Sequence, residues 1–305
     1  MKFGINTAGI GAESTLDGLV AAAKRYETMG FDSLWIAHMS SFDAIMAMAI
    51  VGRETTRLKV ATAVVPSYTR HPYSMAQQAM TAQVASNGRF ILGIGLSHKP
   101  IIEGMYGMSF DKPARHMREY LQVLAPALRC EKVSFKGELY KTNAQLAIEG
   151  ASPVPLVVAA LGDQMLQIAG TYADGTITWM TGPKTLETHI IPKISKAAKE
   201  AGKPAPRIVA GVPFALISDK ASVVDRLNRG LKMYGELPSY RAMLDKEGSA
   251  TPADFTCVGD EKEIRATIRR YRDLGVTDLN CTLLGVGDRE LTLQFLHSEM
   301  KQLAA

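Results

Sequence analysis

Strand-like and helix-like segments alternate along almost the whole chain, and this alternation limits the possible folds more than any other feature. Eight short apolar runs have the pattern of β-strands, and nearly every one is followed by a run with helical spacing. The expected strands lie in residues 2–7, 31–39, 58–65, 88–100, 154–161, 174–180, 207–217 and 277–284. Such strands pair in parallel through right-handed crossovers, and eight of these units close into a barrel.

The sequence therefore predicts an α/β protein with a (β/α)8 TIM barrel. A doubly wound open sheet is the structural alternative. No linker or composition shift divides the chain, so residues 1–305 are interpreted as one domain. We expect an insertion after the fourth strand, with a hairpin over 132–140 that turns at Lys136-Gly137, and a less regular segment over 235–258 before the last helix and strand.

Charge and cysteine usage exclude several classes of function. The net charge of +5 is spread over the sequence without a run of like charge, so no nucleic-acid partner is expected. The three cysteines have no metal-binding spacing, which fits a reducing cytoplasm. The first residues lack the pattern of a signal peptide, and no apolar run is long enough to cross a bilayer, so no membrane association is expected.

The ends of the expected strands give a short set of candidate site residues. In a TIM barrel the active site forms at the carboxyl ends of the strands, whatever the chemistry. Histidines stand at two of these ends, His38 after the second strand and His98 after the fourth. The other candidates at strand ends are Asn6, Val64, Gly95, Ser97, Ala159, Ala160 and Trp179.

Two strand-to-helix turns have the composition of anion sites. "AALGDQM" reaches a helix through Gly162 and Asp163, and "TGPKT" does so through Thr181 and Gly182, with Lys184 nearby. A helix N-terminus offers unpaired N–H groups and the positive end of its dipole to a phosphate. Ordinary helix capping is the alternative at each turn.

Several catalytic signatures are absent from the sequence. There is no HxH, HExxH or GxSxG motif, and no lysine lies within the apolar strands. A metal-dependent hydrolase and a Schiff-base aldolase are therefore disfavoured, and no metal site is expected. A phosphate-compatible rim without a protein nucleophile suggests that a cofactor carries the chemistry.

Residues 70–124 resemble the luciferase-like monooxygenase superfamily, and within it the oxidoreductases that depend on the deazaflavin coenzyme F420. The resemblance is carried by "RHPYSMAQQA", "SNGRFILGIGLS" and "REYLQVL", and it extends to "PLVVAALGDQMLQIAGTYADGTITWM" and "VGDEKEIRATIRRYRDLGVTDL". It implies a barrel with a long insertion, a tricyclic ring at the carboxyl-terminal face, and a homodimer. It also implies F420 as cofactor, with FMN as the alternative.

The same resemblance suggests a reason for the two glycines of "FILGIG". Gly93 and Gly95 would leave room beside the ring, while Ser97 and His98 would reach its pyrimidine edge or the substrate. The alternative is that these glycines only relieve crowding inside the barrel. The non-proline cis peptide of the family, which backs the ring, would map to Ala63–Val64.

Two positions depart from the sugar-phosphate dehydrogenases of this group. In those enzymes, the residues at the matching positions are Asp-His after strand 2 and Thr-Gly-Glu after strand 4. This chain has His38-Met39 and Leu96-Ser97-His98 there. Imidazole can transfer a proton near neutral pH, so His38 and His98 are the candidate catalytic residues, and sugar-phosphate oxidation is disfavoured. Each histidine could instead only orient a loop.

The sequence therefore predicts an enzyme that transfers hydride between C5 of F420 and a small organic substrate. Three alternatives remain at this point. The first is an FMN-dependent monooxygenase with the same fold, and the second is a barrel that binds flavin or deazaflavin without turnover. The third is an isomerase or lyase that uses only the histidines.

Overall fold

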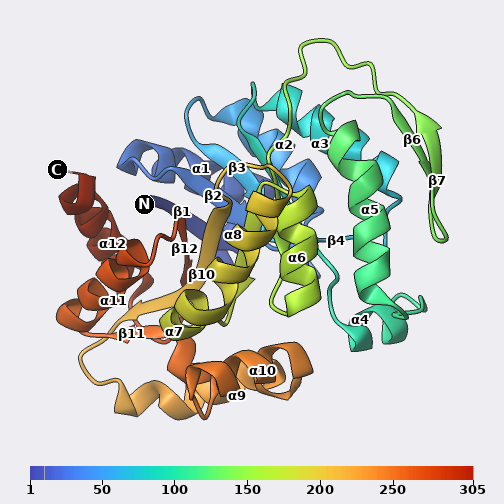
Figure 1. Ribbon diagram of the computed structural model, residues 1–305. Helices are drawn as coiled ribbons and strands as arrows, with labels where there is room; N and C mark the ends of the chain where they lie inside the picture. Colours follow the sequence, from blue (N-terminus) through green and yellow to red (C-terminus); the bar gives the residue numbers. More distant parts are fainter. Residues whose placement is uncertain (10, 305) are drawn as a thin grey trace.

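The computed structural model describes residues 1–9 and 11–304, and its centre is a closed barrel of parallel strands (Figure 1). Each strand pairs with its neighbours in parallel, and β10 pairs with both β9 and β12, which closes the ring. The barrel strands are β1 (Lys2–Thr7), β2 (Ser33–Ile36), β3 (Lys59–Thr62) with β4 (Val65–Pro66), β5 (Phe90–Gly95), β8 (Leu156–Ala159), β9 (Gly175–Trp179), β10 (Arg207–Leu216) and β12 (Asp278–Leu283). The predicted (β/α)8 barrel is confirmed, and the open sheet is excluded.

Helices follow the strands and surround the barrel (Figure 1). They are α1 (Leu16–Met29), α2 (Ala44–Glu54), α3 (Pro72–Ala85), α5 (Pro113–Ala127), α6 (Asp163–Tyr172), α8 (Ile191–Glu200), α11 (Glu261–Asp273) and α12 (Arg289–Ala304). The short α7 (Pro183–Thr185) continues through a π-helical turn (Leu186–Ile190) into α8 without leaving helical backbone angles. Among the described residues, none of the helices combines the length and hydropathy that a membrane span needs.

The third barrel strand is interrupted where the sequence predicts one continuous run over 58–65. β3 ends at Thr62, the peptide bond between Ala63 and Val64 is cis, and β4 resumes at Val65. The position of the cis bond that the resemblance implied is thereby confirmed. Gly93 lies against this break, because a Cβ atom there would come within 2.0 Å of the Thr62 carbonyl oxygen. Crowding inside the barrel therefore accounts for Gly93.

The insertion after the fourth barrel strand contains the short α4 (Lys99–Gly104) and a two-stranded hairpin, β6 (Val133–Lys136) and β7 (Lys141–Ala144). The predicted turn at Lys136-Gly137 is two residues too early, because Lys136 pairs with Lys141 and the turn spans 137–140. The buried carboxylate of Glu119 holds this turn by accepting hydrogen bonds from the backbone N–H groups of residues 138, 139 and 140.

The segment over 235–258 is more regular than the sequence suggests. It contains most of a helical hairpin, α9 (Val224–Glu236) and α10 (Pro238–Glu247), and the start of β11 (Cys257–Gly259), which pairs with β10. α10 buries only Met243 and Leu244, so its apolar repeat is too short to stand out in the sequence. Figure 1 shows α9 and α10 beneath the barrel, toward the side where α4 lies.

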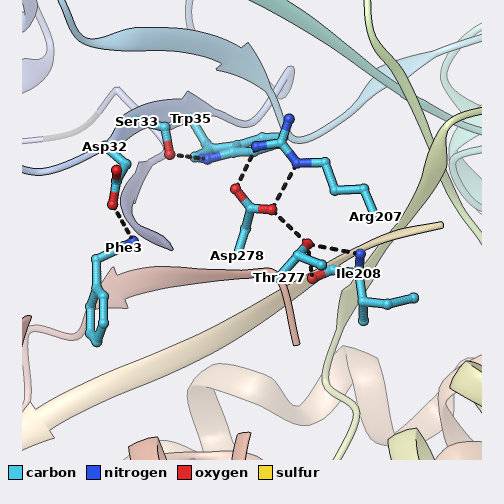
Figure 2. A network of polar contacts seen from close by, with 8 residues as sticks. All are labelled: Phe3, Asp32, Ser33, Trp35, Arg207, Ile208, Thr277 and Asp278. Carbon is cyan, nitrogen blue, oxygen red and sulfur yellow. Dashed lines mark hydrogen bonds and ion pairs between the residues drawn. The ribbon is translucent and has the colours of Figure 1, made fainter. Parts of the chain in front are cut away.

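The amino-terminal end of the barrel is filled by a buried ion pair (Figure 2). The Arg207 guanidinium binds both carboxylate oxygens of Asp278, with its Nε 2.7 Å from one of them, and lies over the ring of Trp35. Asp278 also accepts a hydrogen bond from the Thr277 hydroxyl, and the Trp35 indole donates to Ser33.

Candidate active site

The carboxyl end of the barrel is lined by small side chains. Ala63, Val64 and Ala159 are half-buried and cover an inner layer of larger apolar residues. Gly95 lies beside them, because a Cβ atom there would be 2.8 Å from Val64 Cγ2 and 3.2 Å from Ala159 Cβ. Four of the predicted cofactor-binding positions therefore form one shallow floor. We call Ala63, Val64, Gly95 and Ala159 the barrel floor.

Two asparagines on neighbouring barrel strands have side-chain oxygens without a hydrogen-bond partner among the described residues. Asn6 donates through Nδ2 to the Thr282 hydroxyl at 3.0 Å, and its buried Oδ1 accepts no hydrogen bond from the described residues. Asn280, on the adjacent strand β12, has the same unpaired, buried Oδ1. A buried acceptor without a donor is unfavourable, and in this conformation neither oxygen is accessible from outside the barrel.

His38 stands just after β2, and its ring is oriented by the start of α2. Its Nδ1 accepts a hydrogen bond from the Ala44 N–H at 3.2 Å, which places the proton of the neutral ring on Nε2. Asp43, the N-cap of α2, forms an ion pair with Arg70 close by. Burial and the nearby Arg70 cation lower the pKa of His38, while Asp43 opposes them. His38 is therefore a neutral hydrogen-bond donor near pH 7.

His98 begins α4 but makes no side-chain capping bond to it. Its ring lies 5.6 Å from the ring of Tyr240 on α10, and burial lowers the pKa of His98. The preceding Ser97 has a φ of 59°, a left-handed conformation that turns the chain sharply at the end of β5. Both half-buried residues therefore stand at the strand end where the sequence placed them.

The first of the two predicted anion turns is open in the structure. Gly162 is the N-cap of α6, makes no side-chain capping bond, and has no atom within 4 Å of a built Cβ. The Asp163 carboxylate is directed to Lys193 at 2.6 Å. The Ala160 side chain, by contrast, lies in the core between sheet and helices, so only its backbone borders this turn.

The second predicted anion turn holds a carboxylate of the chain itself. Glu247 of α10 accepts hydrogen bonds from the N–H groups of Lys184 and Thr185, which stand two and three residues after Gly182. The neighbouring Thr181 hydroxyl donates to the carbonyl of Trp179 at 3.1 Å. The Trp179 ring, at the end of β9, packs edge-on against Tyr234 of α9.

Sequence reasoning did not find a polar network beneath β4. His116 of α5 is buried, with its Nε2 2.9 Å from the Ser67 hydroxyl and its Nδ1 3.2 Å from the Tyr140 hydroxyl. Tyr68 stacks on the same imidazole, with ring centroids 3.9 Å apart. Burial lowers the pKa of His116 to about 4, so the ring is neutral. The sequence pattern that could have revealed this network is the set of polar side chains on the buried face of α5, which includes Glu119.

The part of the chain that the structure describes holds no group of three or more His, Cys, Asp or Glu side chains that could bind a metal ion. Its three cysteines, Cys130, Cys257 and Cys281, are free.

Comparison with known proteins identifies the family. The sequence profile of the luciferase-like monooxygenase family matches residues 1–278, and the chain belongs to this family. It is 27% identical over 288 residues to the 5,10-methylenetetrahydromethanopterin reductase of Methanolobus tindarius, which covers 84% of this chain and 87% of that one.

Solved structures share the fold. The coenzyme F420-dependent tetrahydromethanopterin reductase of Methanopyrus kandleri superposes with a TM-score of 0.77 at 22% identity, over 99% of both chains. The oxygenating constituent of 3,6-diketocamphane monooxygenase from Pseudomonas putida, in complex with FMN, has a TM-score of 0.73 at 19% identity, over 98% and 96% of the chains. The chain is an oxidoreductase of the luciferase-like family, for which F420 or FMN is the supported cofactor.

The His116 network predicts an acid-sensitive contribution to stability. The folded state holds the pKa of His116 at about 4, below the value of about 6.5 in an unfolded chain, so the unfolded state binds more protons between these values. This contribution, of the order of 3 kcal/mol, should be complete above pH 6.5 and should be lost as the pH falls to about 4.

Urea unfolding of the wild type and of His116→Gln at several pH values measures this contribution. The difference in unfolding free energy between the two proteins should shrink from pH 7 to pH 4. A difference that stays constant over this range would contradict the account.

Proposed function

We propose that the protein transfers hydride between C5 of a bound F420 and a small organic substrate. The barrel floor carries this proposal, because a planar ring can approach the main chain only where side chains are small. When bound, the deazaflavin supplies the carbon that gives or takes the hydride. The relationship to the Methanolobus tindarius reductase supports F420, because the tetrahydromethanopterin reductase of Methanopyrus kandleri is F420-dependent.

The residues at the mouth fit the polar edge of such a ring. A rotation of the half-buried Asn6 side chain would bring its unpaired Oδ1 to a ring N–H, and the Ser97 hydroxyl can bond the same edge. The open N-terminus of α6 at Gly162 offers N–H groups to the phosphate of the cofactor tail, beside the backbone of Ala160 and Asp163. Trp179 borders the tail from β9. Thr181 and Gly182 can contribute only backbone there, because Glu247 already binds the following amides.

The two histidines would take part in the transfer of one proton. His98 is neutral and lacks a capping partner, so its ring is free to give or take a proton at the substrate. His38, fixed by Ala44, presents Nε2–H as a donor that can polarise a substrate oxygen or nitrogen. The protein would align the reacting carbons and exclude water, which is the larger part of its contribution.

We also propose that the chain works as a homodimer in the cytoplasm. It would form one domain over residues 1–305, of which residues 10 and 305 lie outside the described part. The outer face of α2 and α3 supports a dimer, because neither 44–52 nor 72–85 contains a charged residue. Met46 and Ile50 are 66% and 40% exposed on α2. A helix that is apolar all round is usually covered.

The mass of the protein in solution tests the dimer. Light scattering at micromolar concentration should give twice 33.1 kDa, and Met46→Glu should shift the protein toward monomer. A wild-type protein that is entirely monomeric would contradict this part of the proposal.

Filling the barrel floor should abolish cofactor binding. Ala159→Leu places a larger side chain where the ring would lie, and we expect a rise of at least thirtyfold in the Kd for F420, measured by fluorescence titration. Ala159→Ser, which keeps the size, is the matched control and should bind F420 within threefold of wild type. Unchanged binding by Ala159→Leu would place the ring elsewhere.

Replacement of His98 should separate catalysis from binding. With a substrate that the wild type turns over, His98→Gln should lower kcat by about 100-fold or more, because general acid–base catalysis contributes about 10²- to 10⁴-fold. The Kd for F420 should change less than threefold, and the exposed His71→Gln should behave as wild type. Wild-type F420 complexes that oxidise or reduce none of a broad panel of alcohols, aldehydes and imines would favour the binding-only alternative.

A further inference from the structure

The helical hairpin of α9 and α10 joins two parts of the mouth that the barrel itself keeps apart. At one end of α10, Tyr240 contacts His98, which follows β5. At the other end, Glu247 contacts the start of α7, which follows β9. α10 therefore spans from the candidate catalytic histidine to the second predicted anion turn.

Glu247 makes the polar attachment between α10 and α7. Its two carboxylate oxygens accept from the N–H of Lys184 at 3.0 Å and of Thr185 at 2.7 Å. The Lys184 ammonium group also reaches the Glu247 carbonyl at 3.5 Å, and the Thr185 hydroxyl reaches the carbonyl of Met243 at 3.4 Å. These amides begin a run of helical backbone over 183–200, so the carboxylate also lies at the positive end of a helix dipole.

Gly182 is shaped for this contact. A Cβ atom at Gly182 would lie 2.3 to 2.6 Å from the carboxylate atoms of Glu247. The φ of Gly182 is −80°, a conformation that any residue adopts, so backbone freedom does not explain the glycine. The close approach of Glu247 does.

Contacts between aromatic rings connect α10 to His98. Tyr240 lies 5.6 Å from His98 and 5.1 Å from Tyr234, whose ring in turn contacts Trp179. These four rings form a continuous row from the end of β5 to the end of β9. The row is complete only while α10 is docked, because Tyr240 links His98 to Tyr234.

We propose that Glu247 is a positioning residue: by docking α10 on the start of α7, it holds Tyr240 against His98. This inference rests on the proposed role of His98 in proton transfer. Loss of the docking contact would leave His98 in place after β5 but would expose its ring to water. The Glu247 carboxylate thus acts on the mouth through Tyr240, without touching the substrate.

Hydrogen–deuterium exchange of the cofactor-free protein tests the docking. Glu247→Ala should speed exchange in residues 238–247 about tenfold, with Glu247→Gln intermediate because the amide keeps one acceptor oxygen. Gly182→Ala should have a similar effect through the clash, and the double variant Gly182→Ala with Glu247→Ala should be no worse than either single variant. Glu236→Gln, on the exposed face of α9, is the matched control.

The titration of His98, followed by NMR in the same proteins, separates positioning from a merely structural role. Burial alone lowers the pKa of His98, and Tyr240 is the aromatic ring packed on it, so Glu247→Ala should raise this pKa toward 6.5 while Glu236→Gln leaves it unchanged. Faster exchange with an unchanged His98 titration would overturn the proposal, and so would unchanged exchange. Neither readout uses F420, so failure here is distinct from failure of the proposed function.

Discussion

The open end of the barrel depends on the contact between the third strand and the glycines of the fourth. Where β3 ends, the hydroxyl of Thr62 donates to the carbonyl of Gly93 at 2.8 Å and accepts from its N–H at 2.9 Å. A side chain thus satisfies the two backbone groups of Gly93 that the interrupted strand leaves behind. This lets Ala63 and Val64 leave the sheet and form part of the barrel floor, and any Cβ at Gly93 would block the arrangement.

The two ends of the barrel differ in chemistry: an ion pair fills the amino-terminal end, and small side chains line the carboxyl end. At the amino-terminal end, Arg207 and Asp278 pair in the interior, with Trp35 beneath the guanidinium. Breaking such a buried pair leaves an uncompensated charge, so this end is fixed. At the carboxyl end, small side chains, the half-buried Asn6 and neutral histidines leave a surface that a planar polar ring can complete.

The sequence predicted the barrel and most of its mouth, because both follow from periodicity. Eight strand and helix units determine the fold, and the strand ends then place His38, His98 and three residues of the barrel floor. The fourth, Ala63, followed only from the family resemblance. It did not predict α10 or the role of Glu247, because a tertiary contact between residues 247 and 184 leaves no local pattern. Ala160 was assigned to the mouth although the side-chain alternation of β8 turns it into the core.

Because tertiary contacts leave no local sequence pattern, the sequence did not predict the His116 network or the partner of the second anion turn. Gly182 was interpreted as a phosphate contact, whereas in the structure the approaching anion is a carboxylate of the chain itself. A glycine in a sequence reports that something comes close, but not what comes close. Only the three-dimensional arrangement distinguishes a ligand from another part of the protein.

The central claim is that the barrel floor receives a deazaflavin, and parallel fluorescence titrations of the wild-type protein with F420 and with FMN test it most directly. The account predicts micromolar or tighter binding of F420 to a colourless purified protein, with FMN at least tenfold weaker. A yellow protein that releases FMN on denaturation, or the absence of F420 binding at micromolar concentration, would contradict it.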